Sequence, residues 1–192
     1  MNILILGAAG QIARVATREL LARTDADLTL YARNIARLTP QPRTRIVEGD
    51  VLDATTLAQA MAGQDLVYAN LSGDMEPQAR AIVTAMQAAG VGRVIFIASM
   101  GIYDEVPGES HGAILDPYRN SARVIEGSGL DYAIIRPAWL NDRDEIAYAT
   151  TGKGQPFENA GASVSRRSVA DLIVRLAEQP RLGNVSLGVH HS

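Results

Sequence analysis

The opening sequence MNILILGAAGQIAR constrains the fold more than any other part of the chain. The apolar residues 3–6 lead directly into the GAAG sequence of residues 7–10, and Ile12, Ala16 and Leu20 follow with helical spacing. This pattern predicts a buried strand, a tight turn and the start of a helix. Such a junction directs free backbone N–H groups and the positive end of the helix dipole at one place, where phosphate groups bind.

Further apolar runs follow, separated by stretches with helical spacing. They are LTLYA (28–32), TRIVEG (44–49), DLVYAN (65–70), RVIFIAS (93–99) and DYAIIRP (131–137). Strands that are apolar throughout are buried on both faces, which is typical of a parallel sheet with helices on either side. The sequence therefore predicts a Rossmann-type, doubly wound parallel α/β sheet in three layers, and its 192 residues form most simply a single domain, residues 1–192.

The last third of the chain is predicted to be less regular. We expect a helix over residues 116–126 and an irregular, substrate-side segment over about residues 139–163. The closing helix should begin with Ser168 as its N-cap, supported by Asp171 three residues later, and end at Pro180. The sequence VSLGV (185–189) predicts a final edge strand.

Composition excludes several classes of function. The net charge is −3 with both signs interspersed, so we expect no broad positive face and no nucleic-acid partner. The absence of cysteine removes disulfides and thiolate catalysis, and His190 and His191 lack further ligands, so we expect no metal site. Strand residues begin at Asn2 and no apolar run approaches the ~20 residues of a membrane span; we expect no signal peptide, no membrane partner and a cytoplasmic location.

The glycine turn matches a variant of the dinucleotide-binding motif, Gly7-x-x-Gly10-x-x-Ala13. In such a motif Gly7 permits the turn, Gly10 lets the backbone approach a pyrophosphate, and Ala13 keeps helix and strand close. The alternative is a structural turn that merely needs small residues. The position between a buried strand and a helix favours binding.

The end of the second predicted strand indicates which cofactor is bound. In NAD-binding proteins an acidic side chain ~20 residues after the motif holds the ribose 2′-hydroxyl. Here the strand ends Tyr31-Ala32-Arg33 without a carboxylate, and a guanidinium suits a 2′-phosphate. We therefore expect NADP in preference to NAD. The alternative is that Arg33 and Arg37 are ordinary solvated charges.

Taken in order, GAAGQIA, YARN, EGDVLD, ANLSG, VIFIASMGIY and SGLDYAIIRPAWL resemble the atypical short-chain dehydrogenase/reductases, most of all the small NAD(P)-binding, NmrA-like and flavin-reductase-like members. The resemblance implies that the turn wraps the pyrophosphate, the arginine holds the 2′-phosphate, and the strand ends border the adenine, the ribose and the nicotinamide. The cofactor-binding residues implied in this way are Gly7, Gly10, Gln11, Ile12, Arg33, Asp50, Val51, Asn70, Leu71, Ser72 and Ser99.

One family feature is missing. Well-known members use a serine with a Tyr-x-x-x-Lys pair, because the lysine lowers the tyrosine pKa and grips the nicotinamide ribose. The single lysine here is Lys153; at the required spacing Ala122 follows Tyr118 and Pro107 follows Tyr103. Proton transfer in the family's usual manner is therefore not expected.

Ser99, Tyr103 and Tyr118 are the candidate catalytic residues. Ser99 ends a strand predicted to be central, where ligands bind in open parallel sheets, although it could merely cap that strand. The two tyrosines could serve the pocket or be packing residues. His111 could be a proton source but is more simply a surface residue, and Trp139 is expected in the core, with stacking on a substrate as the alternative.

Two functions follow from these observations. The first is an NADPH-dependent reductase of a small quinone-, flavin- or carbonyl-like acceptor, since the cofactor carries the hydride chemistry and the proton could come from water. The alternative is a non-catalytic NADP-binding sensor or regulator of NmrA-like type, which the missing lysine favours. A sugar-nucleotide or isomerase-type enzyme that uses bound NAD comes last, because the short C-terminal portion leaves little room for a second, substrate-binding domain.

Overall fold

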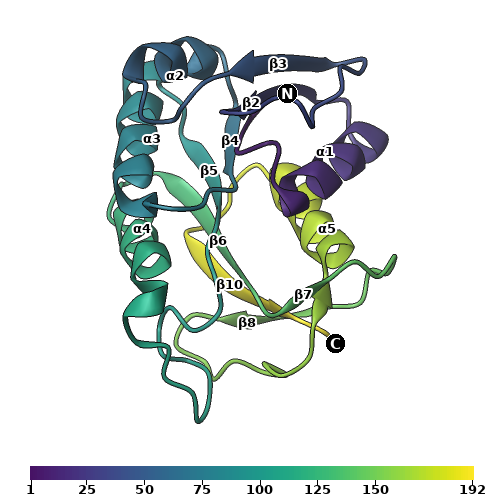
Figure 1. Cartoon of the computed structure of the whole chain (residues 1–192), viewed down its shortest axis with the longest axis vertical. Helices are drawn as coiled ribbons and strands as arrows, with labels where there is room; N and C mark the ends of the chain where they lie inside the picture. Colours follow the sequence, from purple (N-terminus) through teal and green to yellow (C-terminus); the bar gives the residue numbers. More distant parts are fainter.

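An eight-stranded sheet runs through the centre of the protein in a computed structural model that describes residues 1–192 (Figure 1). Its strands lie in the order β3 (Thr44–Glu48), β2 (Asp27–Ala32), β1 (Asn2–Leu6), β4 (Leu66–Ala69), β5 (Arg93–Ile97), β6 (Asp131–Pro137), β10 (Val185–His190) and β8 (Ala149–Gly152). Every neighbouring pair is parallel except β10 and β8. The strand order reverses direction between β1 and β4, which is where ligands bind in sheets of this kind.

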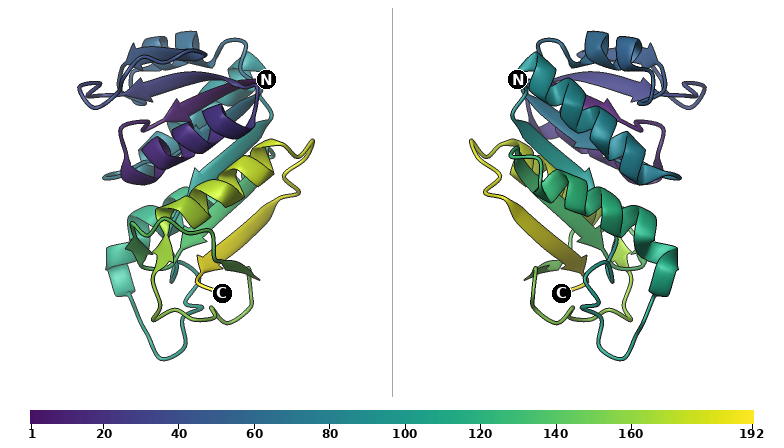
Figure 2. Two further views of the ribbon diagram at one scale, coloured as in Figure 1. Left: turned by 90° about the vertical axis from the view of Figure 1, so that its right-hand side faces the viewer. Right: turned by 90° about the vertical axis from the view of Figure 1, so that its left-hand side faces the viewer.

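Helices cover both faces of the sheet, as the two side views of Figure 2 show. One face carries α1 (Gln11–Arg23) and α5 (Arg166–Ala177), and the other carries α2 (Ala54–Met61), α3 (Met75–Ala89) and α4 (Asp116–Glu126). The predicted three-layer, doubly wound α/β domain is confirmed. None of the helices combines the length and the apolar character needed to cross a bilayer.

Strand β1 shows how the sequence builds these layers. Its side chains alternate between the two faces: Ile3 and Ile5 join the core beneath α1 and α5, whereas Leu4 and Leu6 join the core beneath α2 and α3. All four side chains are fully buried. Burial of each contributes roughly 1.5–3 kcal/mol, which explains why a run without polar residues marks this strand.

The start of α5 differs from the sequence prediction. Ser165, not Ser168, is the N-cap, and its hydroxyl oxygen accepts a hydrogen bond from the Ser168 backbone N–H at 2.9 Å. The cap lies three residues earlier because β9 (Val164–Ser165) pairs with β7 (Leu140–Asn141), which holds Ser165 in extended conformation. A partner more than twenty residues away therefore decides where this helix begins.

The prediction of residues 185–189 as an edge strand is wrong. Strand β10 lies between β6 and β8, and β8 forms the edge of the sheet. Strand β8 comes from within residues 139–163, the segment predicted to be irregular, and its sequence ATTG carries no apolar run. It is a strand because it pairs with β10, so its own sequence gave no signal.

Asp171 joins the two helices on one face of the sheet. Its carboxylate accepts hydrogen bonds from Arg23 of α1 at 2.8 Å, Arg175 of α5 at 2.7 Å and the Tyr148 hydroxyl at 2.8 Å. Burial opposes ionisation of Asp171, but the hydrogen bonds from Tyr148, Arg23 and Arg175 outweigh it and hold the pKa below its usual value of 3.8. The ionised carboxylate therefore adds a polar link between α1 and α5 to the apolar contacts that they share.

This polar link predicts a pH effect on stability. Because the folded-state pKa of Asp171 lies below the unfolded value, its contribution is complete above pH 3.8 and is lost as the pH falls through the folded pKa. We expect Asp171→Asn to lower the urea midpoint at about pH 7. When the pH is then lowered to about 2, the midpoint of the variant should fall by less than that of the wild type, because the variant has no carboxylate to protonate at this position.

The matched control is Asp144→Asn, whose carboxylate is exposed and pairs with Arg167. It should keep the wild-type midpoint and pH profile, since exposed ion pairs contribute little. An Asp171→Asn variant with an unchanged acid profile would contradict the role given to this carboxylate.

Candidate functional site

The turn between β1 and α1 is fixed by contacts that only glycine allows. Gly7 has φ +75°, and its backbone N–H donates to the carbonyl oxygen of Tyr31 at 2.9 Å. A Cβ at Gly7 would lie 2.1 Å from the backbone oxygen of Asn70, and a Cβ at Gly10 would lie 2.2 Å from its side-chain Nδ2. Asn70 is itself held to the end of β1, because its N–H donates to Leu6 at 2.9 Å. The turn and the end of β4 therefore form one rigid unit.

The first turn of α1 lacks a side-chain cap. Gly10 is the N-cap, and no side chain accepts a hydrogen bond from the N–H groups that follow it. Those N–H groups and the positive end of the helix dipole are available to a ligand, and an anionic group such as a pyrophosphate suits both. The backbone therefore fits the phosphates of a dinucleotide.

A cleft of about 240 Å³ opens beside this turn. The glycine turn and the segments that follow β2, β3 and β4 provide its walls. The lining residues are Gly7, Ala9, Gly10, Tyr31, Ala32, Arg33, Asn34, Gly49, Asp50, Val51, Asn70, Leu71, Ser72 and Gln78. Most of the cofactor-binding residues predicted from the sequence thus come together, while Gln11, Ile12 and Ser99 lie outside the lining.

Six residues of this lining are absent from the set predicted from the sequence: Ala9, Tyr31, Ala32, Asn34, Gly49 and Gln78. Of these, Tyr31 and Gly49 contact each other. The Tyr31 hydroxyl donates to the backbone oxygen of Asp50 at 2.8 Å, and burial, with the carboxylates of Asp53 and Asp50, raises its pKa to about 12. A Cβ at Gly49 would lie 2.4 Å from this hydroxyl oxygen. The tyrosine and the glycine fix the end of β3 against β2. The EGD sequence was the only available signal, because its glycine follows a predicted strand.

Arg33 lies at the exposed rim of the cleft, directly after β2. Asp50 is the one acidic residue of the lining, and it follows β3 rather than β2. The position that would carry an acid for a ribose 2′-hydroxyl is therefore occupied by a cation.

Ser99 lies at the carboxyl end of β5, beside the end of β6. The backbone on either side of it is anchored there, since the Ala98 N–H donates to Ile135 at 2.8 Å and the Met100 N–H to Pro137 at 3.2 Å. The Ser99 hydroxyl donates only to the backbone oxygen of Met100, at 3.1 Å. It is half-buried and can turn toward a ligand at this edge of the sheet.

Tyr118 lies in the first turn of α4 and is half-buried against the core on that face. Its hydroxyl has no hydrogen-bond partner within the protein, which distinguishes it from Tyr103. Ala122, one turn later, cannot supply the charge that a lysine would. The phenol is therefore available to a ligand, but no cation beside it on α4 activates it.

The Tyr103 hydroxyl is turned away from the cleft. It donates to Glu126 Oε1 at 2.6 Å and lies 3.1 Å from the Ser186 hydroxyl, which places it toward β10, near the far edge of the sheet. Lys153 approaches the same carboxylate oxygen at 2.7 Å and lies 4.5 Å from the centre of the Tyr103 ring. Burial and the Glu126 carboxylate raise the pKa of Tyr103. Closeness in sequence to Ser99 did not bring this hydroxyl to the cleft.

Two further residues are placed by the structure. Trp139 is 64% exposed, so its predicted core position is wrong. His111 packs against Gly101, where a Cβ would lie 2.7 Å from its Nδ1, and its Nε2 lies 3.0 Å from Glu109.

The fold and the turn define a dinucleotide-binding protein of Rossmann type. The sequence model of the NAD(P)H-binding family matches residues 7–180, and the chain belongs to this family. The resemblance to the atypical short-chain dehydrogenase/reductases is confirmed, and the fold is that of an NAD(P)-binding, reductase-like protein.

Solved structures of relatives agree with this assignment. The chain is 42% identical to a Rossmann-fold NAD(P)-binding family protein from Shigella flexneri, with 99% of this chain and 93% of that chain covered and a TM-score of 0.87. It is 28% identical to a short-chain dehydrogenase/reductase from Veillonella parvula in complex with NADP, with 99% and 94% covered and a TM-score of 0.90.

A curated relative is an enzyme. The chain is 28% identical over 137 residues to (4-alkanoyl-5-oxo-2,5-dihydrofuran-3-yl)methyl phosphate reductase from Streptomyces griseus. The match covers 70% of this chain but only 46% of the reductase, so the chain spans less than two thirds of that protein.

The contact between Gly10 and Asn70 predicts the effect of one added methyl group. In Gly10→Ala the new Cβ must displace the Asn70 amide, which lies 2.2 Å from its position and lines the cleft. We expect dinucleotide affinity, measured by calorimetry, to fall at least about tenfold, or about 1.4 kcal/mol, with the fold retained.

Gly161→Ala is the matched control, because a Cβ there meets nothing within 4 Å. It should bind as the wild type does. Normal binding by Gly10→Ala would mean that the turn is only structural.

Proposed function

We propose that the protein is an NADPH-dependent reductase of a small quinone-, flavin- or carbonyl-like acceptor, acting in the cytoplasm. The observation that carries the proposal is the uncapped start of α1 beside Gly7 and Gly10, with Arg33 on the rim of the same cleft. When bound, the nicotinamide supplies the hydride chemistry. The chain's own residues position the dinucleotide and shape the space for the acceptor.

The choice of NADP over NAD rests on Arg33. A guanidinium forms paired, charge-assisted hydrogen bonds with a phosphate, and no carboxylate follows β2 to hold a ribose 2′-hydroxyl. The complex of the Veillonella parvula relative with NADP supports this choice. Gly7, Gly10, Gln11 and Ile12 would meet the pyrophosphate through their backbone.

Arg33→Ala should therefore discriminate between the cofactors. We expect the binding free energy of NADP(H) to weaken by about 1.5–3 kcal/mol, the range for a hydrogen bond to a charged group. The affinity for NAD(H) should stay nearly unchanged. Calorimetric titration of both cofactors checks this. Arg80→Ala, an exposed arginine paired with Glu76 on α3, is the control and should alter neither affinity. Equal wild-type affinities for NADP and NAD would contradict the proposal.

The proposed class of acceptor follows from the missing lysine. Lys153 is held by Glu126 at 2.7 Å, and the free hydroxyl of Tyr118 has Ala122 where a lysine would stand. A phenol without a neighbouring cation lacks the group that activates it as a proton donor in the related enzymes. Acceptors that take their proton from water suit such a site. The reductase activity named for the Streptomyces griseus relative supports reduction as the reaction.

Ser99 and Tyr118 are proposed to contact the nicotinamide or the acceptor. Since neither acts as an activated acid, Tyr118→Phe and Ser99→Ala should each reduce kcat by less than the ~10²-fold that loss of a positioned general acid causes. Steady-state kinetics on the best acceptor from a screen of quinones, flavins and aldehydes measures this, with Tyr103→Phe for comparison. A loss of several hundredfold in Tyr118→Phe with cofactor binding intact would show that this phenol donates the proton.

The alternative function is a non-catalytic NADP-binding sensor. The same observation favours it, since Tyr118 lacks the lysine that would activate it. Tight NADPH binding without turnover on any acceptor of the screen would select the sensor over the reductase.

A further inference from the structure

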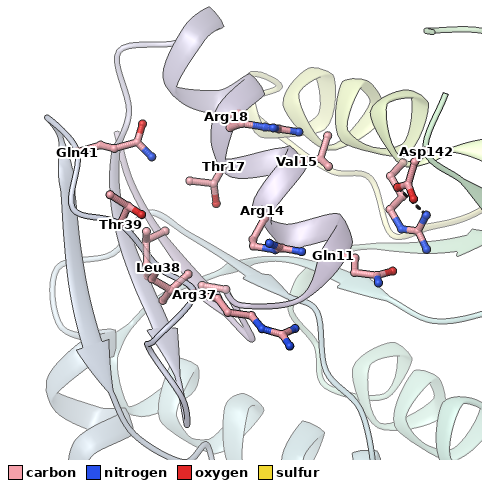
Figure 3. Close-up of a pocket in the computed structure, with 13 residues that line it drawn as sticks. Gln11, Arg14, Val15, Thr17, Arg18, Arg37, Leu38, Thr39, Gln41 and Asp142 are labelled. Carbon is pink, nitrogen blue, oxygen red and sulfur yellow. Dashed lines mark hydrogen bonds and ion pairs between the residues drawn. The ribbon is translucent and has the colours of Figure 1, made fainter. Parts of the chain in front are cut away.

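A second cavity, of about 370 Å³, adjoins the glycine turn through Ala8 and Gln11. Figure 3 shows the side chains that line it. The outer face of α1 forms one wall with Arg14 and Arg18, and the segment after β2 forms the opposite wall with Arg37. Arg166, at the start of α5, and Asp142 complete the lining. We call this cavity the arginine groove. It shares no lining residue with the cleft described above.

The arginine groove carries an excess of positive charge in a chain of net charge −3. Four arginines line it against one carboxylate, that of Asp142. That carboxylate is already engaged with Arg166 at 2.9 Å, the pair drawn with a dashed line in Figure 3. Arg14, Arg18 and Arg37 take part in none of the protein's ion pairs.

Two details make this arrangement unfavourable without a ligand. Arg14 and Arg18 stand four residues apart on one face of α1, where like charges repel. The Nε of Arg166 is buried and has no hydrogen-bond partner. The nearby carboxylate of Glu19 does not neutralise Arg14 or Arg18 or bond to Arg166, since it is paired with Arg167 at 3.2 Å. An anion in the arginine groove would offset the repulsion between Arg14 and Arg18.

We propose that the arginine groove binds a free small molecule that carries two or more phosphate groups, at the same time as a dinucleotide occupies the cleft. Guanidinium groups bind phosphate oxygens in pairs, and arginines on both walls provide contacts for more than one phosphate. The volume lies within the range of about 300–1,000 Å³ of small-molecule sites. The two linings have no residue in common, although Ala8 and Gln11 of the arginine groove directly adjoin Gly7 and Gly10 of the cleft.

Calorimetric titration with inorganic pyrophosphate tests the proposal, using the full chain saturated with NAD⁺. We expect binding at one site, at least about tenfold weaker in Arg18→Gln and in Arg14→Gln. Arg123→Gln is the matched control, since Arg123 is also an exposed helical arginine but lies on α4, on the other face of the sheet. It should bind pyrophosphate as the wild type does. All three side chains are exposed, so the fold should be retained, which circular dichroism checks.

Three outcomes would overturn the proposal. Absence of binding, or equal binding by Arg18→Gln and the wild type, would show that the arginine groove is not the site. Pyrophosphate binding to the chain without NAD⁺ that disappears in the NAD⁺-saturated chain would place the anion in the cleft. Displacement by NADP⁺ but not by NAD⁺ would mean that the arginine groove receives the 2′-phosphate of the cofactor instead of a free ligand.

Discussion

The contact between the glycine turn and Asn70 is the constraint on which the site depends. The backbone oxygen and the side-chain amide of Asn70 occupy the space where Gly7 and Gly10 would otherwise carry a Cβ. This contact brings the ends of β1 and β4 together at the point where the strand order reverses. The start of α1 therefore borders the cleft through its N-cap Gly10, and the uncapped N–H groups of its first turn have no partner among the protein's side chains.

The other half of the sheet is organised around a buried charge. Arg136, at the end of β6, is fully buried and bonded to Glu105, and it also donates to the backbone oxygen of Thr151 at 3.1 Å. A buried guanidinium requires such partners, because an unpaired charge in the interior is costly. The Glu105 carboxylate also accepts hydrogen bonds from the backbone N–H groups of Gly101 and Tyr103, which fixes the loop after β5. Within that loop the Tyr103 hydroxyl donates to Glu126. The hydrogen bonds of Tyr103 therefore stabilise this part of the fold, although the sequence made Tyr103 a candidate catalytic residue.

Most of the fold and much of the cleft could be predicted from local patterns. Strands β2 and β6 and helix α4 fall where their apolar runs and helical spacing place them, since burial selects the residues that form them. The sequence also indicated the turn and the residues after β2, β3 and β4, because parallel strands end at a common edge. Local patterns failed at Ser165, at β8 and at Tyr103, where partners more than twenty residues away decide the conformation.

The sequence by itself determined the class of fold, the glycine turn and the cation after β2, because each follows from a local pattern: repeated apolar runs, small residues between a strand and a helix, and the residue that directly follows a strand. Only the tertiary structure decided that Asn70 closes the turn, that Tyr31 and Gly49 fix the end of β3, that Lys153 pairs with Glu126, and that arginines from α1, α5 and the segment after β2 line one groove. The physical reason is that these contacts join segments far apart in the chain. The distances between these segments depend on how the whole sheet twists and packs, and a local sequence pattern carries no information about them.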